Sequence, residues 1–161
     1  MKKEVSIRKA TLKDLHAINN LNNQFCNHLT NKYPARKEII NLKLSKKKLI
    51  ELIKQDLRSK IKGYFLIEKN GTPIGFSRFW IKKPPVWIKF KKEADITDLF
   101  INSKYRKKGY GKELLNHTIN FLNKKDCKLF TLGVHPKNPA QKLYLRVGFK
   151  QNYIGMYKII K

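Results

Sequence analysis

A basic, glycine-containing turn joins an apolar strand pattern to a helical pattern in the second half of the chain, and this junction constrains the fold most. The turn reads Arg106-Lys107-Lys108-Gly109-Tyr110-Gly111, between a strand predicted over residues 94–101 and a helix predicted over residues 111–123. A helix N-terminus carries unpaired amides and partial positive charge, so it binds phosphate oxygens. Glycine lets the backbone come close to such an anion. The junction is typical of a phosphate-binding loop, and a basic solvated turn is the alternative.

Hydrophobic periodicity predicts the elements on the N-terminal side of this junction. Residues 5–8 alternate like a strand, and Thr11 with Asp14 resembles a capping box at the start of a helix. A second helix is predicted to begin at Ser45, with a loop between the two helices. Residues 64–67 and 74–80 flank Asn70-Gly71, which indicates a hairpin because both central residues of its turn need positive φ.

The C-terminal side completes a mixed order of elements. We expect a strand over residues 129–134, a short helix over 139–147 that ends at Gly148, and one or two strands from Phe149 onward. The resulting order, β-α-α-β-β-β-α-β-α-β, indicates a mixed α/β sheet and lacks the regular alternation of a doubly wound fold.

Two common kinds of site are not indicated. Gly109-Tyr110-Gly111 is not followed by a glycine three residues later, so the dinucleotide-binding fingerprint is absent, and no Walker A motif exists. No metal site is expected either. The histidines show no metal-ligand spacing with one another or with the cysteines; they are His16, His28, His117 and His135.

Length and cysteine usage predict a simple organisation. The 161 residues suit one domain, 1–161, and no apolar run approaches the ~20 residues of a membrane helix. We therefore expect no membrane insertion, and no secretory signal is visible. Cys26 and Cys127 stand far apart and suit two reduced thiols in a cytoplasmic protein.

The charge is extreme, with 37 basic against 11 acidic residues and a net charge of +26. Such a surface favours nucleic acid, ribosomes or acidic membranes. Codon bias is the alternative, because 31 of the 37 basic residues are lysine. Aromatic residues interleave with lysines around Trp80 and Trp87, where they could stack bases. The same residues could instead form one face of a hairpin that packs on the core.

A second motif makes a family resemblance specific. Residues 139–149 read Pro-Ala-x-x-Leu-Tyr-x-x-x-Gly-Phe, with the tyrosine at Tyr144. This segment and the earlier Arg-x-x-Gly-x-Gly turn resemble, in order, the catalytic-tyrosine helix and the pyrophosphate loop of the GNAT superfamily of N-acetyltransferases. The resemblance implies a mostly antiparallel, twisted sheet of 6–7 strands flanked by about four helices, with splayed central strands that hold CoA.

The resemblance also implies an activity. The protein is expected to move an acetyl group from acetyl-CoA to a primary amine by direct attack in a ternary complex, as a monomer or a homodimer. The acceptor could be a small cationic amine or a peptide or protein amine. The alternative is a basic module, associated with nucleic acid or ribosomes, that has a GNAT fold and little turnover.

The cofactor-binding residues follow from the same resemblance. The family usually places asparagine seven residues before the tyrosine, but Lys137 stands there, so either Asn138 serves or that contact to the pantetheine arm is lost. A backbone N–H near Leu99 or Phe100 would polarise the thioester. The expected contacts are Leu99, Phe100, Ile101, Arg106, Lys107, Lys108, Gly109, Tyr110, Gly111, Lys112 and Asn138.

Two catalytic roles are predicted, a general acid and a general base. By resemblance Tyr144 is the general acid for the departing thiolate, and packing is the alternative. Asp95 is expected to draw the amine proton through a water, with Asp98 as the second candidate and His135 as a third. Strand alternation predicts that Asp95 shares a face with Leu99 and that Asp98 lies on the opposite face. Charges that solvate the end of a strand are the alternative explanation of this acidic cluster.

Overall fold

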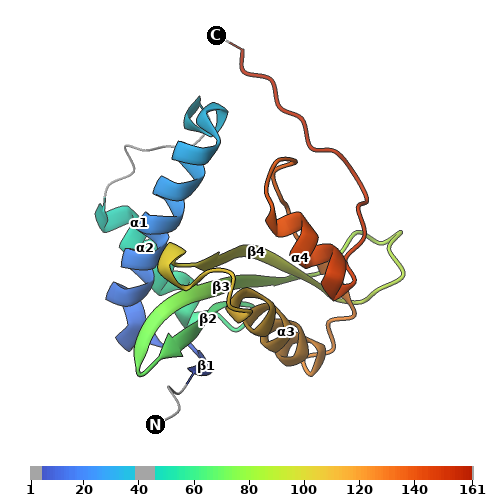
Figure 1. Cartoon of the computed structure of the whole chain (residues 1–161). Coiled ribbons are helices and arrows are strands. Elements are labelled where there is room, and N and C mark those ends of the chain that lie inside the picture. The colour runs from blue at the N-terminus through green and yellow to red at the C-terminus, as the bar shows by residue number, and fades with distance from the viewer. Residues whose placement is uncertain (1–4, 39–45, 161) are drawn as a thin grey trace.

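The computed structural model describes residues 5–38 and 46–160, within which a five-stranded sheet carries four α-helices (Figure 1). The mixed α/β class predicted from the sequence is confirmed, while Ser45, the predicted start of the second helix, lies outside the described residues. The strands are β1 (Val5–Lys9), β2 (Lys62–Lys69), β3 (Thr72–Lys82), β4 (Glu93–Ile101) and β5 (Leu129–Thr131). The helices are α1 (Leu15–Lys32), α2 (Lys46–Arg58), α3 (Tyr110–Asn123) and α4 (Ala140–Val147), with 3-10 turns η1 (Leu12–Asp14), η2 (Pro34–Glu38) and η3 (Ser103–Tyr105).

The order of strands in the sheet is the order in the chain, β1-β2-β3-β4-β5, and only the last pair of neighbours is parallel. Strands β1 to β4 are antiparallel neighbours, whereas β5 runs parallel to β4. That parallel pairing involves only Glu93–Asp95 of β4. Within the described part of the chain, residues 96–101 of β4 therefore have no partner strand on the β5 side.

Alternate residues of the central strands build two cores on opposite faces of the sheet. Phe65 and Ile67 of β2 join the core covered by α3, together with Leu114 and Leu122. On the other face Tyr64 and Leu66 join Phe76, Phe100, Ile18 of α1 and Ile53 of α2. None of the helices in the described ranges is long and apolar enough to cross a lipid bilayer.

Local chain signals behave as expected where they depend on neighbours in sequence. Asn70 and Gly71 have φ of 51° and 74°, as the predicted tight turn requires. The Thr11 N–H donates to Asp14 Oδ2 at 2.8 Å, which confirms the capping box. Helix α4 ends at Gly148 with φ of 104°, the left-handed conformation of a helix C-terminus.

The prediction of six to seven strands is wrong for the described chain. Strand β5 ends at Thr131 rather than Val134, and residues 149–160 form no strand. After Gly148 the chain runs away from the sheet, as the red trace in Figure 1 shows, and residues 150–160 are all exposed. Aromatic and β-branched residues make this segment look like a strand, but strand formation also needs a partner edge, which sequence composition does not specify.

One ion-pair network ties β1 to the start of α1 and to β2. The Arg8 guanidinium donates to Asp14 Oδ1 at 2.7 Å and to Glu68 Oε1 at 2.6 Å. Hydrogen bonding from Arg8 is the main reason that the pKa of Asp14 falls to about 2, and the bond from Thr11 adds to it. The Asp14 side chain is 10% exposed, whereas Arg8 is 43% exposed, so solvent weakens the pair.

Replacement of this carboxylate should destabilise the protein in a pH-dependent way. We expect Asp14→Asn to lower the free energy of unfolding by about 1 kcal/mol at pH 7. The folded pKa lies below the unfolded value of about 3.9, so the contribution is complete above pH ~4 and is lost as pH falls towards 2. Urea denaturation across this range measures the difference, with exposed Asp126→Asn as the control. Equal stability of the Asp14 variant and the parent at pH 7 would contradict the network.

Candidate active site

The basic turn adopts the backbone conformation that an anion-binding loop needs. Lys107 and Gly109 have positive φ, 61° and 87°, and Gly109 is the residue before α3. The first intrahelical bonds run from the Lys112 and Glu113 amides to the Gly109 carbonyl. The Arg106 amide donates to the Ser103 carbonyl at 3.3 Å, whereas the amides of residues 107–111 have no backbone acceptor among the described residues, so they are available to an anion.

Arg106 contributes to this loop as an anchor, in a way that the sequence did not indicate. Its Nε donates to the Ile101 carbonyl at 2.8 Å, and its Nη1 lies 3.3 Å from His28 Nε2 on α1. The guanidinium also lies over the Phe100 ring, 5.5 Å from its centre. These contacts direct the Arg106 charge towards β4 and α1, so the exposed cations of the loop are Lys107 and Lys108.

The other residues predicted at the loop divide between core and solvent. Lys112 is exposed on the first turn of α3, whereas Tyr110 is half-buried and packs against the α3-side core. A Cβ added to Gly111 would meet Leu143 at 3.6 Å, an ordinary contact distance, so crowding by the described chain does not require glycine there. At Gly109 the requirement comes from positive φ, because no atom lies within 4 Å of an added Cβ.

The end of β4 presents backbone rather than side chains. Phe100 and Ile101 are buried in the two cores, and Leu99 packs against the α3-side core. These residues therefore present their peptide groups at the edge of β4 that β5 does not cover. An extended ligand can add to such an edge as a further strand would.

The side chain of Asn138 is engaged in a hydrogen bond at the start of α4. Its Oδ1 accepts a hydrogen bond from the Ala140 amide at 3.0 Å, which caps the start of α4. Its own amide donates to the carbonyl of His135. His135 in turn stacks on Tyr33, with ring centres 4.0 Å apart.

A β-bulge corrects the predicted placement of the acidic residues. Arg78 of β3 pairs with Asp98 and Trp80 pairs with Asp95, so Thr97 is an extra residue on β4. Paired residues of antiparallel strands share a face, as do residues two apart on one strand. Asp95 and Asp98 therefore lie on the same face, not on opposite faces, because the bulge shifts the alternation by one residue.

The two carboxylates nevertheless have different surroundings. Asp95 Oδ2 accepts from Lys82 Nζ at 2.7 Å, so its charge is neutralised by an ion pair. Asp98 Oδ2 lies 3.6 Å from Arg78 Nη1 and accepts from the Thr97 hydroxyl at 3.3 Å. Burial raises the pKa of Asp98 above its ordinary value, although Arg78 and Thr97 act in the opposite direction.

Arg78 is the residue that sequence reasoning missed. Its Nε donates to Asp56 of α2 at 2.8 Å, and its guanidinium lies over the Tyr64 ring at 5.8 Å. It thus links α2 to the carboxylate of Asp98. The sequence feature that could have identified Arg78 is that it is an arginine within an apolar strand, since only six of the 37 basic residues are arginine.

Tyr144 of α4 is electrostatically coupled to Asp98. Burial, with a further contribution from the negative charge of Asp98, raises the pKa of Tyr144 to about 12. The phenol is therefore protonated at neutral pH and available as a hydrogen-bond donor. Asp98 also raises the pKa of Cys26 on α1, although burial contributes more. The structure thus brings both Tyr144 and Cys26 within electrostatic reach of Asp98.

Comparison with known sequences supports one family. The model of the family described as Acetyltransferase (GNAT) matches residues 23–149. An uncharacterised N-acetyltransferase of Methanocaldococcus jannaschii is 30% identical over 105 residues, which cover 62% of this chain and 45% of that protein. A Bacillus subtilis protein, whose name proposes ribosomal protein bS18-alanine N-acetyltransferase activity, is 31% identical over 88 residues, 54% of this chain and 53% of that protein. The chain spans about half the length of these relatives.

Comparison with solved structures supports the fold. The aminoglycoside N-acetyltransferase AAC(6')-Iy in complex with CoA superposes with a TM-score of 0.78 at 16% identity. The match covers 100% of this chain and 97% of that one. At this identity the likeness concerns architecture, because one fold supports many functions.

The coupling between Asp98 and Tyr144 can be measured directly. We expect Asp98→Asn to lower the pKa of Tyr144, while burial keeps it above the ordinary value of about 10. Titration of protein labelled with 13C at the tyrosine ring follows this pKa, and Tyr144→Phe identifies the resonance. Asp95→Asn is the matched control. It should change the pKa of Tyr144 less than Asp98→Asn does, because Lys82 offsets the charge of Asp95. Equal shifts in the two variants would contradict the arrangement.

Proposed function

Because the chain belongs to the Acetyltransferase (GNAT) family, we propose that it is an N-acetyltransferase that moves the acetyl group of acetyl-CoA to a primary amine. The observation that carries this proposal is the course of β4. Its final residues have one open edge among the described residues, it ends at the anion-binding loop, and it carries Asp98 opposite Arg78.

Acetyl-CoA has two features that suit these residues. Its pyrophosphate would accept hydrogen bonds from the backbone amides between Arg106 and Gly111, with Lys107 and Lys108 adding positive charge. Its pantetheine arm would lie along the open edge of β4 and bond to the peptide groups near Leu99 and Ile101. In this proposal the Arg106 side chain positions the loop and does not contact phosphate.

The reaction needs two assisted proton transfers. First, the acceptor ammonium gives a proton to a base and attacks the thioester carbon as a neutral amine. The carbon–sulfur bond breaks and, second, the thiolate takes up a proton from an acid, while the nitrogen releases its other proton as the amide forms and so restores the acid. We assign the second proton to Tyr144, whose high pKa keeps it protonated. We assign the first to Asp98, acting through a water, in preference to Asp95. The reason is that Lys82 holds Asp95 in an ion pair, whereas burial makes Asp98 a stronger base.

The acceptor is proposed to be a primary amine that arrives as a cation. Asp98 and Asp95 of β4 lie on the same face of the sheet as Arg78 of β3, and an ammonium group is attracted to a carboxylate there. Two acceptor classes are suggested by the similar proteins, an aminoglycoside and a peptide with N-terminal alanine. A polyamine completes a panel that separates small cations from peptide amines.

CoA binding should depend on the left-handed conformation at Gly109. We expect Gly109→Ala to weaken CoA binding at least tenfold by calorimetry, because an L-residue disfavours φ of 87° and the loop amides would turn away from the phosphates. Gly71→Ala is the matched control. Gly71 has φ of 74° and equally open surroundings, but it lies in the β2–β3 turn. Both variants should lose similar stability, and only the first should lose CoA affinity. If both bind CoA equally well, the loop does not hold the pyrophosphate.

Turnover should identify the acid and the base. With the best acceptor of the panel, Tyr144→Phe should lower kcat by ~10² to 10⁴ while CoA affinity stays nearly constant. The base form of Asp98 exists above its raised pKa, so parent activity should fall as pH drops through that value. Asp98→Asn should lack this limb and lose most activity where the acceptor is still protonated. Thiol release at each pH measures these rates.

Asp95→Asn is the control for the base assignment. It removes a carboxylate from the same face but one that Lys82 neutralises, so its pH profile should keep the shape of the parent. If Asp95→Asn lacks the fall in activity at low pH and Asp98→Asn keeps it, the general base is Asp95. Unchanged kcat in Tyr144→Phe, with chemistry rate-limiting, would leave that tyrosine a packing role.

A further inference from the structure

The connection between β3 and β4 places an aromatic residue in solvent. In this segment, here called the tryptophan loop (residues 83–92), Trp87 is 80% exposed and Val86 is 91% exposed. The sequence left open whether this segment packs on the core or stacks on bases. Packing does not describe its tip, because the indole remains in water.

The tryptophan loop is also strongly basic. No acidic residue occurs between Lys82 and Glu93, and both of these are engaged with each other at 3.6 Å. The loop's four cations are all exposed, and one ammonium lies 5.4 Å from the Phe90 ring. They are Lys83, Lys89, Lys91 and Lys92.

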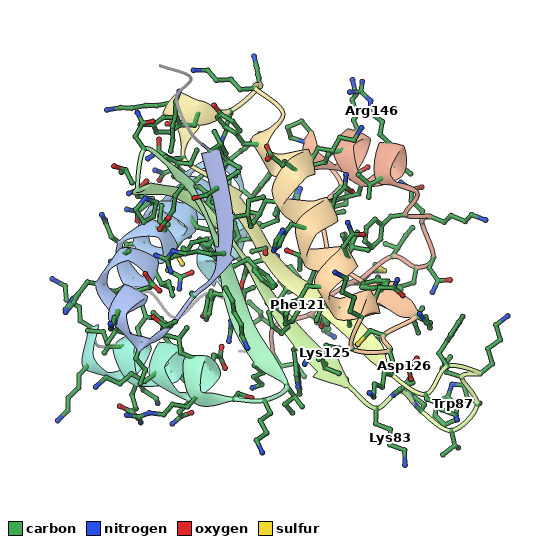
Figure 2. All side chains as sticks on the ribbon, turned by 90° about the horizontal axis from the view of Figure 1, so that it is seen from below. Lys83, Trp87, Phe121, Lys125, Asp126 and Arg146 are labelled. Carbon is green, nitrogen blue, oxygen red and sulfur yellow. The ribbon has the colours of Figure 1, made fainter. Side chains whose placement is uncertain are left out.

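This positive surface continues into a neighbouring hollow. Lys92 Nζ donates to the Lys125 carbonyl at 3.0 Å, which joins the loop to the end of α3. The hollow has an aromatic wall, and the ammonium groups of Lys9 and Lys125 lie 5.9 Å and 5.8 Å from the Phe121 ring. Its lining residues are Lys9, Ser59, Lys60, Phe79, Ile81, Phe121 and Lys125. Figure 2 shows Phe121 and Lys125 on the same side of the molecule as Trp87 and Lys83.

We propose that the tryptophan loop and this hollow together form a binding track for single-stranded nucleic acid, with RNA as the partner. Exposed aromatic rings stack on unpaired bases of any sequence, and lysines follow the phosphates. A flexible strand can follow the loop and enter the hollow, whereas a flat bilayer fits a concave surface poorly. A second copy of a chain with net charge +26 would be repelled. Two acids adjoin the track, Asp126 beside Lys125 and Glu93 at the end of the loop.

The track is separate from the proposed catalytic residues. Helix α3 begins at the anion-binding loop and ends near Lys125, and its 14 residues span about 21 Å. RNA binding can therefore be tested without acetyl-CoA. Its failure would leave the acetyltransferase proposal intact, and the reverse also holds.

The test uses fluorescence anisotropy with a labelled oligouridylate of about 16 nucleotides, titrated at several salt concentrations. Trp87→Ala should weaken binding about tenfold, and Trp87→Phe should retain most of the affinity because an aromatic face remains. Replacement of Lys9, Lys60 and Lys125 together by Gln should lower the salt slope by about two, since each phosphate contact on a single strand contributes about 0.7. Circular dichroism checks that the variants fold.

A charge-matched variant separates a site from general attraction. Replacement of Lys13, Lys46 and Lys47 by Gln removes the same charge from exposed positions on η1 and α2. It should weaken binding less than the triple variant of the hollow does. Equal losses in the two triple variants, or unchanged affinity in Trp87→Ala, would overturn the proposal.

Two further ligands identify the partner class. A duplex of the same length should bind more weakly than the single strand, because its bases are not free to stack. Vesicles of phosphatidylglycerol should leave Trp87 emission near its position in water. Equal affinity for the duplex would overturn the single-strand assignment. A blue shift with vesicles, without binding to the oligouridylate, would assign the surface to membranes instead.

Discussion

Strand β4 is held along its length by β3, but by β5 only at Glu93–Asp95. This unequal pairing determines what the rest of the molecule can do. A strand paired on both sides would have no free peptide groups, and the anion-binding loop at its end would face a closed sheet. Because β4 leaves β5 early, an extended ligand can lie along it and reach the start of α3. The two cores hold Phe100 and Ile101 from opposite faces, so this edge stays rigid without a neighbour.

The bulge at Thr97 matters because it places two carboxylates on one face of the sheet in different surroundings. Asp95 and Asp98 share a face, yet Lys82 neutralises one and burial raises the pKa of the other. Arg78 limits that rise while it ties the carboxylate to α2. Two acids three residues apart on one strand thereby have different surroundings, and Asp98 is the one whose charge acts on Tyr144.

Sequence reasoning succeeded where structure depends on near neighbours. The Asn70-Gly71 turn, the Thr11–Asp14 box and the left-handed Gly148 all follow from local backbone geometry. It failed where a partner far along the chain decides. The bulge at Thr97 exists only relative to β3, and the segment after Gly148 has the residue types of a strand but no partner strand within the described chain. The side chain of Arg106 likewise turns to His28, 78 residues away.

The orientation of Arg106 bears on how this loop can vary in related chains. With the guanidinium bonded to the Ile101 carbonyl, the proposed anion site rests on peptide amides, whose chemistry every residue except proline shares. Substitution at Lys108 would alter the strength of attraction to an anion, whereas Lys107, with φ of 61°, also bears on the shape of the loop. Handedness at Gly109 is the feature that cannot drift freely. A site of this kind would tolerate side-chain substitutions for as long as its backbone conformation is kept.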